Sequence, residues 1–443
     1  MHDILVVSEK ANWQIILTVI IFLITYAVVI TERMNRAVVA LSGAAVMMIF
    51  GIVDARTAFS EHVEWGTIFL LIGMMILVGI TNKTGIFQYA AVKAAQAAKG
   101  DPKRILVALG LLTAVASAFL DNVTTVLLVV PVTLSITRML RLNPVPYLIT
   151  EIMSSNIGGT ATLIGDPPNI MIGSANPGLT FNDFLVNLSP IIIIVMLVTI
   201  LLLVWYYRKQ LVAQEADKAE LMALDAKSYI KQPALMRKSI AVLLLTITGF
   251  VLHSVLHVEA AVVALSGAML LMLIGVKKEQ AEEAFDAVEW ETIFFFIGLF
   301  ILVGGLVETG VIENLAARTL EITSGDIPYT AMLILWVSGI ASATIDNIPF
   351  VAAMIPLIQD MGKEINAAGN PELMNSLWWS LSLGACLGGN GTLIGATANV
   401  IVAGMAAREN KGFSYMEFLK IGAPLTLLAL MLSTVYVYLF LLP

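Results

Sequence analysis

Apolar stretches about as long as a membrane-spanning helix alternate with short polar turns along almost the whole chain. Runs of this length are typical of transmembrane α-helices, because about 20 residues cross a bilayer. The first run covers about 13–31 and the last about 423–441. A single long polar segment, 208–238, divides the series into two parts. The pattern predicts an all-α polytopic membrane protein with a connector between its two parts.

Two of the apolar runs are interrupted near their middle by an Asp-Asn pair. The pairs are Asp121-Asn122 and Asp346-Asn347. Each uncharged arm of the first run has about 15 residues, or about 22–24 Å as helix, which is shorter than a hydrocarbon core of about 30 Å. We therefore expect two re-entrant helical hairpins, at about 104–139 and about 327–360. A carboxylate at this depth is costly, so it marks a functional site.

A second kind of interruption follows each hairpin. The pairs Gly158-Gly159 and Gly388-Gly389 each weaken a helix by about 1 kcal/mol per glycine, and Pro167-Pro168 ends one. We expect broken transmembrane helices at about 144–175 and about 377–406. Backbone amides and carbonyls exposed at such breaks hold ions through partial charges. The alternatives are a kink that serves packing alone, and aspartates that only cap the following helix.

The two parts of the chain repeat each other. Ala37–Ala44 recurs as Ala261–Ala268, and Gly158–Asn169 recurs in altered form as Gly388–Asn399, with the shorter blocks between them in the same order. Internal repeats of this kind build many secondary transporters. We expect the following divisions: an N-terminal helix at 1–36, a first repeat at 37–207, a cytoplasmic connector at 208–238 and a second, inverted repeat at 239–443.

Lysine and arginine set the expected orientation, since cytoplasmic loops are rich in both. If the first hairpin enters from the cytoplasm, the basic residues gather on the cytoplasmic side. The exceptions are Lys10, Arg56, Arg318 and Lys363. Both termini then lie outside, and the two repeats start on opposite sides, so their hairpin tips and breaks meet near one midplane site. The expected location is a bacterial or archaeal plasma membrane.

Oxygen-bearing side chains at the tips and breaks, with the neighbouring glycines, form the candidate substrate and ion site. Such oxygens suit a hard cation, or a proton on an aspartate. The candidate residues are Asp121, Asn122, Thr124, Thr125, Asn156, Gly158, Gly159, Thr160, Thr162, Asp166, Asn169, Asp346, Asn347, Cys386, Gly389, Asn390, Gly391, Thr392 and Asn399. We expect Na⁺, where it binds, at Asp121, Asn122, Asp346 and Asn347.

The two copies differ inside this motif. Asp166 in the first break corresponds to Ala396 in the second, and Asn156 corresponds to Cys386. This asymmetry suggests that one half handles the substrate and the other the coupling ion. A thiol at Cys386 could meet a thiophilic substrate, although a lone cysteine in a membrane helix more often packs.

Composition narrows the function classes. The chain has 443 residues, of which 58% are hydrophobic and 13% charged, against about 25% charged in soluble domains. It carries no GKS or GKT phosphate loop, so transport would be secondary, with Na⁺ or H⁺ as coupling ion and no other cofactor. A nucleic-acid partner is not expected. A different class, the intramembrane aspartyl proteases, has a Gly-x-Gly-Asp motif, which reads Leu163-Ile-Gly-Asp166 here.

The hairpin tips and glycine-rich breaks resemble the motifs of the ion transporter superfamily. Within it, they are most similar to the branch of the ArsB arsenite permeases, the NhaD-type sodium/proton antiporters and the melanosomal P protein, over about 30–440. The resemblance implies an inverted-repeat fold, a homodimer, and a scaffold domain beside a transport domain that moves like an elevator. It also implies a site between the tips and the broken helices.

The tips depart from the Ser-Asn-Thr of the dicarboxylate branch and read Asp-Asn-Val and Asp-Asn-Ile. Because two extra carboxylates repel a polyanion, citrate or succinate is disfavoured as a lone substrate. Our first expectation is efflux of arsenite or antimonite coupled to an ion gradient, for which an ATPase subunit could be a partner. Sodium/proton antiport is the second, and transport of an organic anion together with cations is the third.

Overall fold

The computed structural model describes residues 11–31, 33–367 and 372–442. In this part of the chain every regular element is a helix. Nine of the described helices are long and apolar enough to cross a membrane. The prediction of an all-α polytopic membrane protein is confirmed.

The first half of the chain folds into helices on both sides of the first Asp-Asn pair. They are α1 (Asn12–Ile30), α2 (Arg36–Ile49), α3 (Ala55–Thr57), a π-helical turn at Ala58–His62, α4 (Trp65–Asn82), α5 (Ile86–Ala97), α6 (Pro102–Phe119), α7 (Asn122–Met139), α8 (Val145–Gly159), α9 (Pro167–Ala175) and α10 (Phe181–Tyr207). The connector and the second half follow. Their helices are α11 (Glu215–Ala223), a 3₁₀ turn at Ala226–Tyr229, α12 (Pro233–Leu256), α13 (Ala260–Gly275), a 3₁₀ turn at Lys278–Gln280, α14 (Ala281–Phe285), α15 (Trp290–Glu308), α16 (Val311–Ile322), α17 (Ile327–Thr344), α18 (Asn347–Ala367), α19 (Glu372–Gly388), α20 (Thr397–Arg408), α21 (Tyr415–Tyr436) and a π-helical turn at Val437–Leu441.

Equivalent helices of the two halves make equivalent contacts. α2 of the first half packs against α15 of the second, and α13 of the second packs against α4 of the first. A Cβ built on Gly73 would lie 2.7 Å from the backbone of Ala264, and one built on Gly298 would lie 2.7 Å from the backbone of Ala40. Matching close approaches of this kind are what two related halves would make. The inverted orientation stays a prediction.

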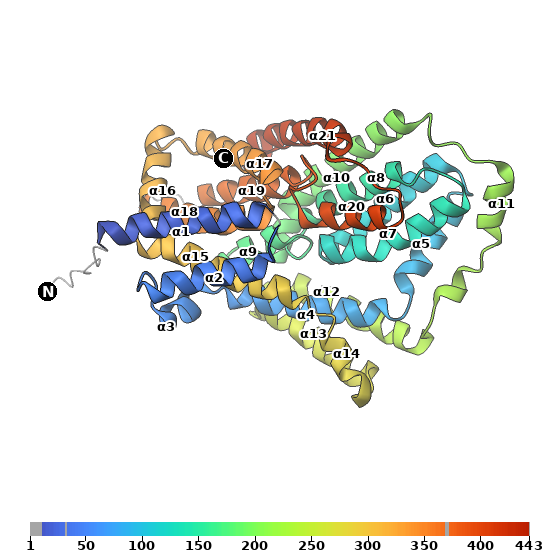
Figure 1. Cartoon of the computed structure of the whole chain (residues 1–443), viewed down its shortest axis with the longest axis horizontal. Helices are drawn as coiled ribbons and strands as arrows, with labels where there is room; N and C mark the ends of the chain where they lie inside the picture. Colours follow the sequence, from blue (N-terminus) through green and yellow to red (C-terminus); the bar gives the residue numbers. More distant parts are fainter. Residues whose placement is uncertain (1–10, 32, 368–371, 443) are drawn as a thin grey trace.

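The hairpin arms lie in opposite halves of the molecule. α6 and α7 occupy one half of the long axis, and α17 and α18 occupy the other (Figure 1). The helix breaks fall at the two Asp-Asn pairs, but α6 and α7 each have 18 residues, more than the expected 15. An arm of 18 residues is about 27 Å long, which nearly crosses the hydrocarbon core. Re-entrance of the hairpins therefore stays a prediction. The longer arms weaken the argument that the hairpins are too short to cross the membrane.

Other boundaries also differ from the sequence predictions. α18 extends the second hairpin to Ala367, the second broken helix covers 372–408, and α12 begins at Pro233, inside the predicted connector. The Lys and Arg residues of 233–238 favoured a polar loop, but Pro233 is well suited to the first turn of a helix. The site is unaffected, because all these changes lie at the outer ends of helices.

The connector is folded against the first half. Its backbone reaches α5: Gln96 Nε2 donates a hydrogen bond to the Leu224 carbonyl at 2.8 Å, and Lys231 N donates to the Thr84 carbonyl at 3.0 Å. Gly85 has a φ of 82°, and a Cβ there would lie 1.9 Å from the Tyr229 carbonyl oxygen. Glycine is therefore needed where the connector crosses the start of α5.

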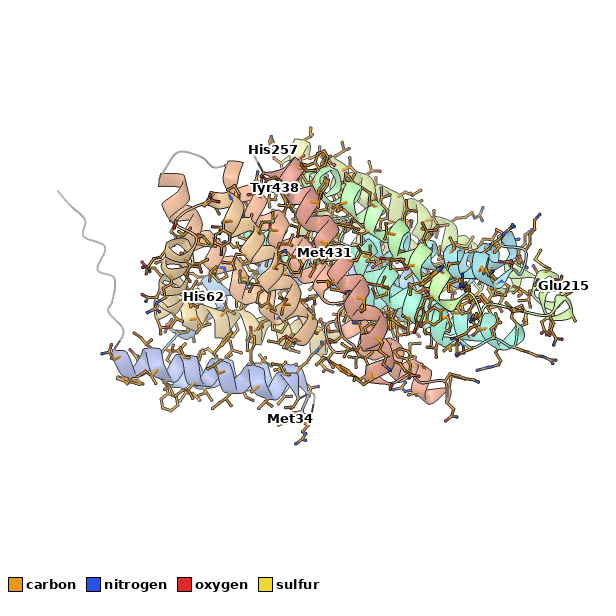
Figure 2. The ribbon with its side chains drawn as sticks, turned by 90° about the horizontal axis from the view of Figure 1, so that it is seen from above. Met34, His62, Glu215, His257, Met431 and Tyr438 are labelled. Carbon is orange, nitrogen blue, oxygen red and sulfur yellow. The ribbon has the colours of Figure 1, made fainter. Side chains whose placement is uncertain are left out.

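α1 lies along the side of the molecule, with Met34 beyond its end (Figure 2). Its outer face is apolar and exposed. The exposed side chains include Trp13, Ile16, Ile20, Leu23 and Ile24. Only 11% of the apolar span of α1 is buried, as expected for a helix with one face toward lipid.

Candidate functional site

The site lies where four helices begin. α7 begins at Asn122, α9 at Pro167, α18 at Asn347 and α20 at Thr397, and these first residues all line one cavity of about 20 Å³. A cavity needs about 10–15 Å³ to hold one water molecule, so this one fits a single small ion or water. Two of the helices follow hairpin tips and two follow breaks. The structure thus brings together the four interruptions that the sequence singled out.

Two aspartates already occupy the positively polarised starts of their own helices. Asp121 accepts a hydrogen bond from Thr124 N at 2.8 Å and another from the Thr124 hydroxyl. Asp346 accepts a hydrogen bond from Ile348 N at 3.0 Å. A helix N-terminus attracts anions through its free amides and its dipole. Here the carboxylates serve as those anions, so capping is part of their role.

Asp166 offers the free acceptor of the cavity. It immediately precedes α9 and is fully buried. Its Oδ1 accepts a hydrogen bond from Asn122 Nδ2 at 3.3 Å, while its Oδ2 is buried and has no hydrogen-bond partner among the described residues. The side-chain nitrogen of Asn347, which lines the same cavity, is also buried without a partner there. The side chains of Asn347 and Cys386 lie close enough to Asp166 to interact with it, and buried polar atoms are nearly always paired. A small ion or a water between Asp166 and Asn347 would pair both atoms.

A network of asparagines joins the two halves behind this cavity. Asn122 Nδ2 donates to Asn156 Oδ1 at 3.0 Å. Asn156 Nδ2 in turn donates to Asn390 Oδ1 and Asn399 Oδ1, both at 2.9 Å. The first half of the chain is therefore hydrogen-bonded to the broken helix of the second half. In the reverse direction, Cys386 donates to Asn169 Oδ1 at 3.6 Å.

The remaining polar candidates hold the loops of the breaks in place. Asn169 Nδ2 donates to the carbonyls of Thr160 and Thr162, and Asn399 Nδ2 to those of Gly389 and Thr392. The hydroxyls of Thr162 and Thr392 reach back to the preceding hairpins, at the carbonyls of Ala118 and Ala343. Thr160 bonds within its own helix, to the Asn156 carbonyl. The Thr125 hydroxyl is buried without a partner in the described part.

The glycines act through close packing. A Cβ on Gly158 would lie 2.2 Å from the carbonyl oxygen of Ala114 on α6, and one on Gly391 would lie 2.6 Å from the Cβ of Ala343. Gly159 and Gly389 face the backbone of Gly165 and Gly395 in the same way, at 2.5 and 3.1 Å. These glycines therefore let backbone segments touch near the site.

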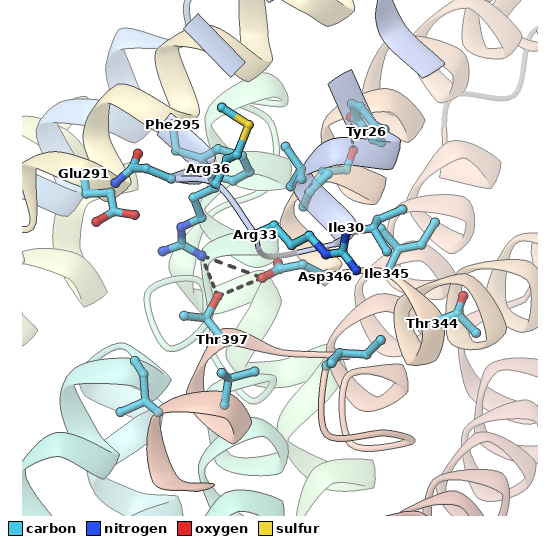
Figure 3. A pocket seen from close by; sticks show the side chains of 17 residues that line it. Tyr26, Ile30, Arg33, Arg36, Glu291, Phe295, Thr344, Ile345, Asp346 and Thr397 are labelled. Carbon is cyan, nitrogen blue, oxygen red and sulfur yellow. Dashed lines mark hydrogen bonds and ion pairs between the residues drawn. The ribbon is translucent and has the colours of Figure 1, made fainter. Parts of the chain in front are cut away.

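Arg36 was missed as a site residue. It lies at the start of α2, where its charge was interpreted only as an orientation signal. Its guanidinium donates to Thr397 Oγ1 at 2.9 Å and to Thr292 Oγ1 at 3.1 Å, and it lies 3.9 Å from Asp346 Oδ2. Figure 3 shows Arg36, Asp346 and Thr397 on the wall of a larger cavity of about 380 Å³. Arg36 and Thr397 line both cavities.

Asp346 lines a different cavity from the other predicted Na⁺ ligands. It lines the larger cavity, whereas Asp121, Asn122 and Asn347 line the smaller one. Thr397 donates to Asp346 Oδ2 at 2.7 Å. One signal could have revealed this cluster: Arg36 precedes the first copy of a repeated block, and the position before the second copy is Ala260. A charge present in one copy alone is the same kind of asymmetry as Asp166 against Ala396.

Glu289 and Thr292 also line the small cavity. Thr292 donates to Glu289 Oε2 at 3.1 Å. In the part of the chain that the structure describes, no three carboxylate, imidazole or thiol groups gather as a metal-binding cluster. A cation here would therefore be held by one or two carboxylates together with amide and hydroxyl oxygens.

Comparison with known proteins identifies the fold and the family of the chain. The chain resembles the Alcanivorax borkumensis YdaH transporter in fold, with a TM-score of 0.61 at 12% identity over 96% of this chain and 97% of that one. An uncharacterized transporter of Mycobacterium tuberculosis is 44% identical over 96% of this chain and 98% of its own. The human P protein is 33% identical over 93% of this chain and 58% of its own length.

The apolar helices and these relatives together define a multi-pass membrane transporter. The sequence model of the citrate transporter family matches residues 26–384, which is most of the chain. The protein belongs to this family, and its similarity to the P protein confirms the resemblance found in its motifs.

Proposed function

We propose that the protein is a secondary transporter that exchanges Na⁺ for H⁺ at the small cavity. The observation that carries this proposal is Asp166 Oδ2, a buried acceptor without a partner among the described residues, in a cavity that fits one ion. A carboxylate there can hold either Na⁺ or a proton, and exclusive binding of the two is the basis of exchange.

The electrostatics of the cavity favour a cation as the cargo. The helix starts, which would otherwise bind an anion, are already neutralised by Asp121 and Asp346. Asp166 and Glu289 add two more carboxylates at the small cavity, and Arg36 is the basic residue there. An anion would meet repulsion at this point, whereas a cation or proton would be attracted.

Exchange across proteoliposome membranes tests the proposal. We expect Asp166→Asn to lower Na⁺/H⁺ exchange at least roughly tenfold, since loss of about 1.4 kcal/mol of ion binding has that effect. Asp54→Asn is the matched control, because Asp54 caps α3 outside both cavities and asparagine caps a helix equally well. Wild-type exchange in Asp166→Asn would contradict the proposal.

A second candidate is transport of an organic anion together with the cation. The larger cavity, of about 380 Å³, is lined by Arg33 and Arg36 and would fit a small carboxylate. The name of the matching family, citrate transporter, points the same way. Counterflow of citrate in the same proteoliposomes, with and without Na⁺, separates this candidate from simple exchange.

Arsenite efflux, the first expectation from sequence, stays an untested prediction. Cys386 is fully buried, and its thiol donates a hydrogen bond to Asn169. The thiol is therefore not free to bind arsenite, and this residue gives arsenite efflux no support. A neutral arsenic hydroxide would have to be bound by amide and hydroxyl groups alone. The protease alternative gains no support either, because a cavity of about 20 Å³ has no room for a peptide. Arsenite counterflow completes the set of assays.

A further inference from the structure

A second buried carboxyl group lies outside the cation cavity. Glu151, on α8, is fully buried. The hydroxyl of Thr133 on α7 donates to its Oε1, while its Oε2 is buried without a hydrogen-bond partner in the described part of the chain. An ionised carboxylate with a single neutral partner is very costly in an apolar interior. The neutral acid is the form that this environment accepts.

Among the described side chains, no charged group pairs with Glu151 from the helices that pack most closely against α8, which are α6, α7, α10, α19 and α20. Their titratable side chains, with that of Tyr147 on α8 itself, are Lys103, Arg104, Arg138, Asp183, Tyr206, Tyr207, Cys386 and Arg408 among the described side chains. Tyr147 donates to the Pro102 carbonyl and Cys386 to Asn169. None of the ion pairs or hydrogen bonds in the described part joins any of them to Glu151.

The second half lacks this pair. By the alignment that matches Asn156 with Cys386 and Pro131 with Pro356, Glu151 corresponds to Leu381 and Thr133 to Ile358. Leu381 and Ile358 are both fully buried. The same packing position therefore accepts two apolar side chains, so the fold does not require an acid there.

The pair lies between a cavity at the end of α7 and the central site. That cavity, of about 310 Å³, is lined by Leu134, Thr137, basic residues of both halves, and Glu409, which forms an ion pair with Arg138. Thr133 lies one helical turn from Thr137, and both threonines are buried. In the other direction, Glu151 is five residues before Asn156 of the central network, or about 7.5 Å along α8.

We propose that Glu151 is a second proton-binding site, which takes up and releases one proton in each transport cycle between the cavity at the end of α7 and the central site. On release, the O–H bond of the carboxyl group breaks, the proton passes to water in that cavity, and the Thr133 hydroxyl keeps donating to the carboxylate. On uptake, the O–H bond of a protonated Asp166 in the central site breaks, and the proton it releases forms the O–H bond of Glu151. The inference rests on the proposed coupling to a proton.

Labelling of the wild-type protein in proteoliposomes tests the site without any substitution. A hydrophobic carbodiimide reacts with a protonated carboxyl group inside a membrane, and mass spectrometry locates the adduct. We expect labelling at Glu151 that falls as pH rises. Labelling that is absent, or independent of pH, would overturn the proposal. If Glu151 labels as expected while Na⁺/H⁺ exchange is absent, the exchange proposal fails. This one then survives only if a pH gradient drives transport of another substrate, which the counterflow assays measure.

The double variant Glu151→Leu/Thr133→Ile separates a functional role from a structural one, because it installs the residues of the second half. Replacing a buried polar pair by apolar side chains is often neutral or stabilising, so we expect unchanged or higher thermal stability. We expect the transport rate to lose its pH dependence or to fall at least roughly tenfold. Thr246→Val, a buried threonine of α12 outside both cavities, is the control. A wild-type rate and pH profile in the double variant would contradict the proposal.

Discussion

At the scale of single residues, the site depends on positions where a side chain larger than hydrogen does not fit. Gly158 and Gly388 occupy equivalent places at the ends of α8 and α19. Their built Cβ atoms would lie 2.2 Å from the Ala114 carbonyl oxygen and 2.5 Å from the Gly339 carbonyl oxygen. Both contacts are to backbone, which cannot rotate away. The breaks are therefore held against the hairpins by close backbone contact.

Substitution of these glycines by alanine should destabilise the protein. We expect Gly158→Ala and Gly388→Ala each to lower stability by about 1–3 kcal/mol, the usual cost of overpacking, measured as a lower unfolding temperature in detergent. Gly404→Ala on α20 is the control, because no atom lies within 4 Å of a Cβ built there. It should be neutral or stabilising by up to about 1 kcal/mol. Equal unfolding temperatures for all three variants would refute this packing role.

The residues found and missed by sequence differ in one physical respect. Asp121, Asn156 and Asp166 stood out because they are polar within long apolar runs. Arg36 did not, since a basic residue at a helix start also marks membrane orientation. Its contact with Thr397 joins residues 361 positions apart, and no local pattern shows such a pair.

At the scale of elements, the helices fall into two sets, which contact each other through α4 with α7 and α9 and through α15 with α18. α2, α4, α13 and α15 pack in pairs across the halves, whereas α6 packs on α8 and α17 on α19 within each half. One contact between the sets is that of α4 with α9. There, a Cβ built on Gly66 lies 3.6 Å from the Cβ of Ser174. The predicted elevator movement would have to break this contact.

A disulfide between α4 and α9 tests that movement. A Cβ separation of 3.6 Å is within the range of about 3.5–4.5 Å for disulfides, so Gly66→Cys/Ser174→Cys should crosslink on oxidation. We expect transport to stop in the oxidised protein and to return on reduction. The control is Gly412→Cys/Ala407→Cys, with the same separation of 3.6 Å within one segment, which should transport in both states. Transport by the oxidised α4–α9 variant would rule out the movement.

The sequence predicted the elements better than their ends. The helix breaks at both tips and both glycine pairs were placed correctly, because Asp, Asn, Gly and Pro change backbone preference locally. The outer ends of α12, α18 and α19 were not, since amphipathic turns continue a helix beyond its apolar run. The packing of the connector on α5 could not be predicted from the sequence either. It depends on hydrogen bonds to backbone carbonyls, such as those of Thr84 and Leu224, and these leave no periodic pattern in the sequence.

At the scale of the whole molecule, both halves line the candidate site and supply different charged groups to it. The first half supplies Asp166 and the acid Glu151, whereas the second supplies Asp346, which faces Arg36 and the larger cavity. This division is consistent with a coupling ion in one place and a substrate entrance in the other. The homodimer, the outside location of both termini and the plasma membrane stay predictions for this assembly.

An anomalous difference map of crystals grown with Tl⁺, which replaces Na⁺ and scatters strongly, tests the central claim most directly. The claim is that two hairpin tips and two helix breaks enclose one cation site. We predict a peak inside the small cavity, beside Asp166 Oδ2 and between Asp121 and Asn347. Tl⁺ found only beside Asp346 or on the surface, or hairpin tips that lie apart, would contradict it.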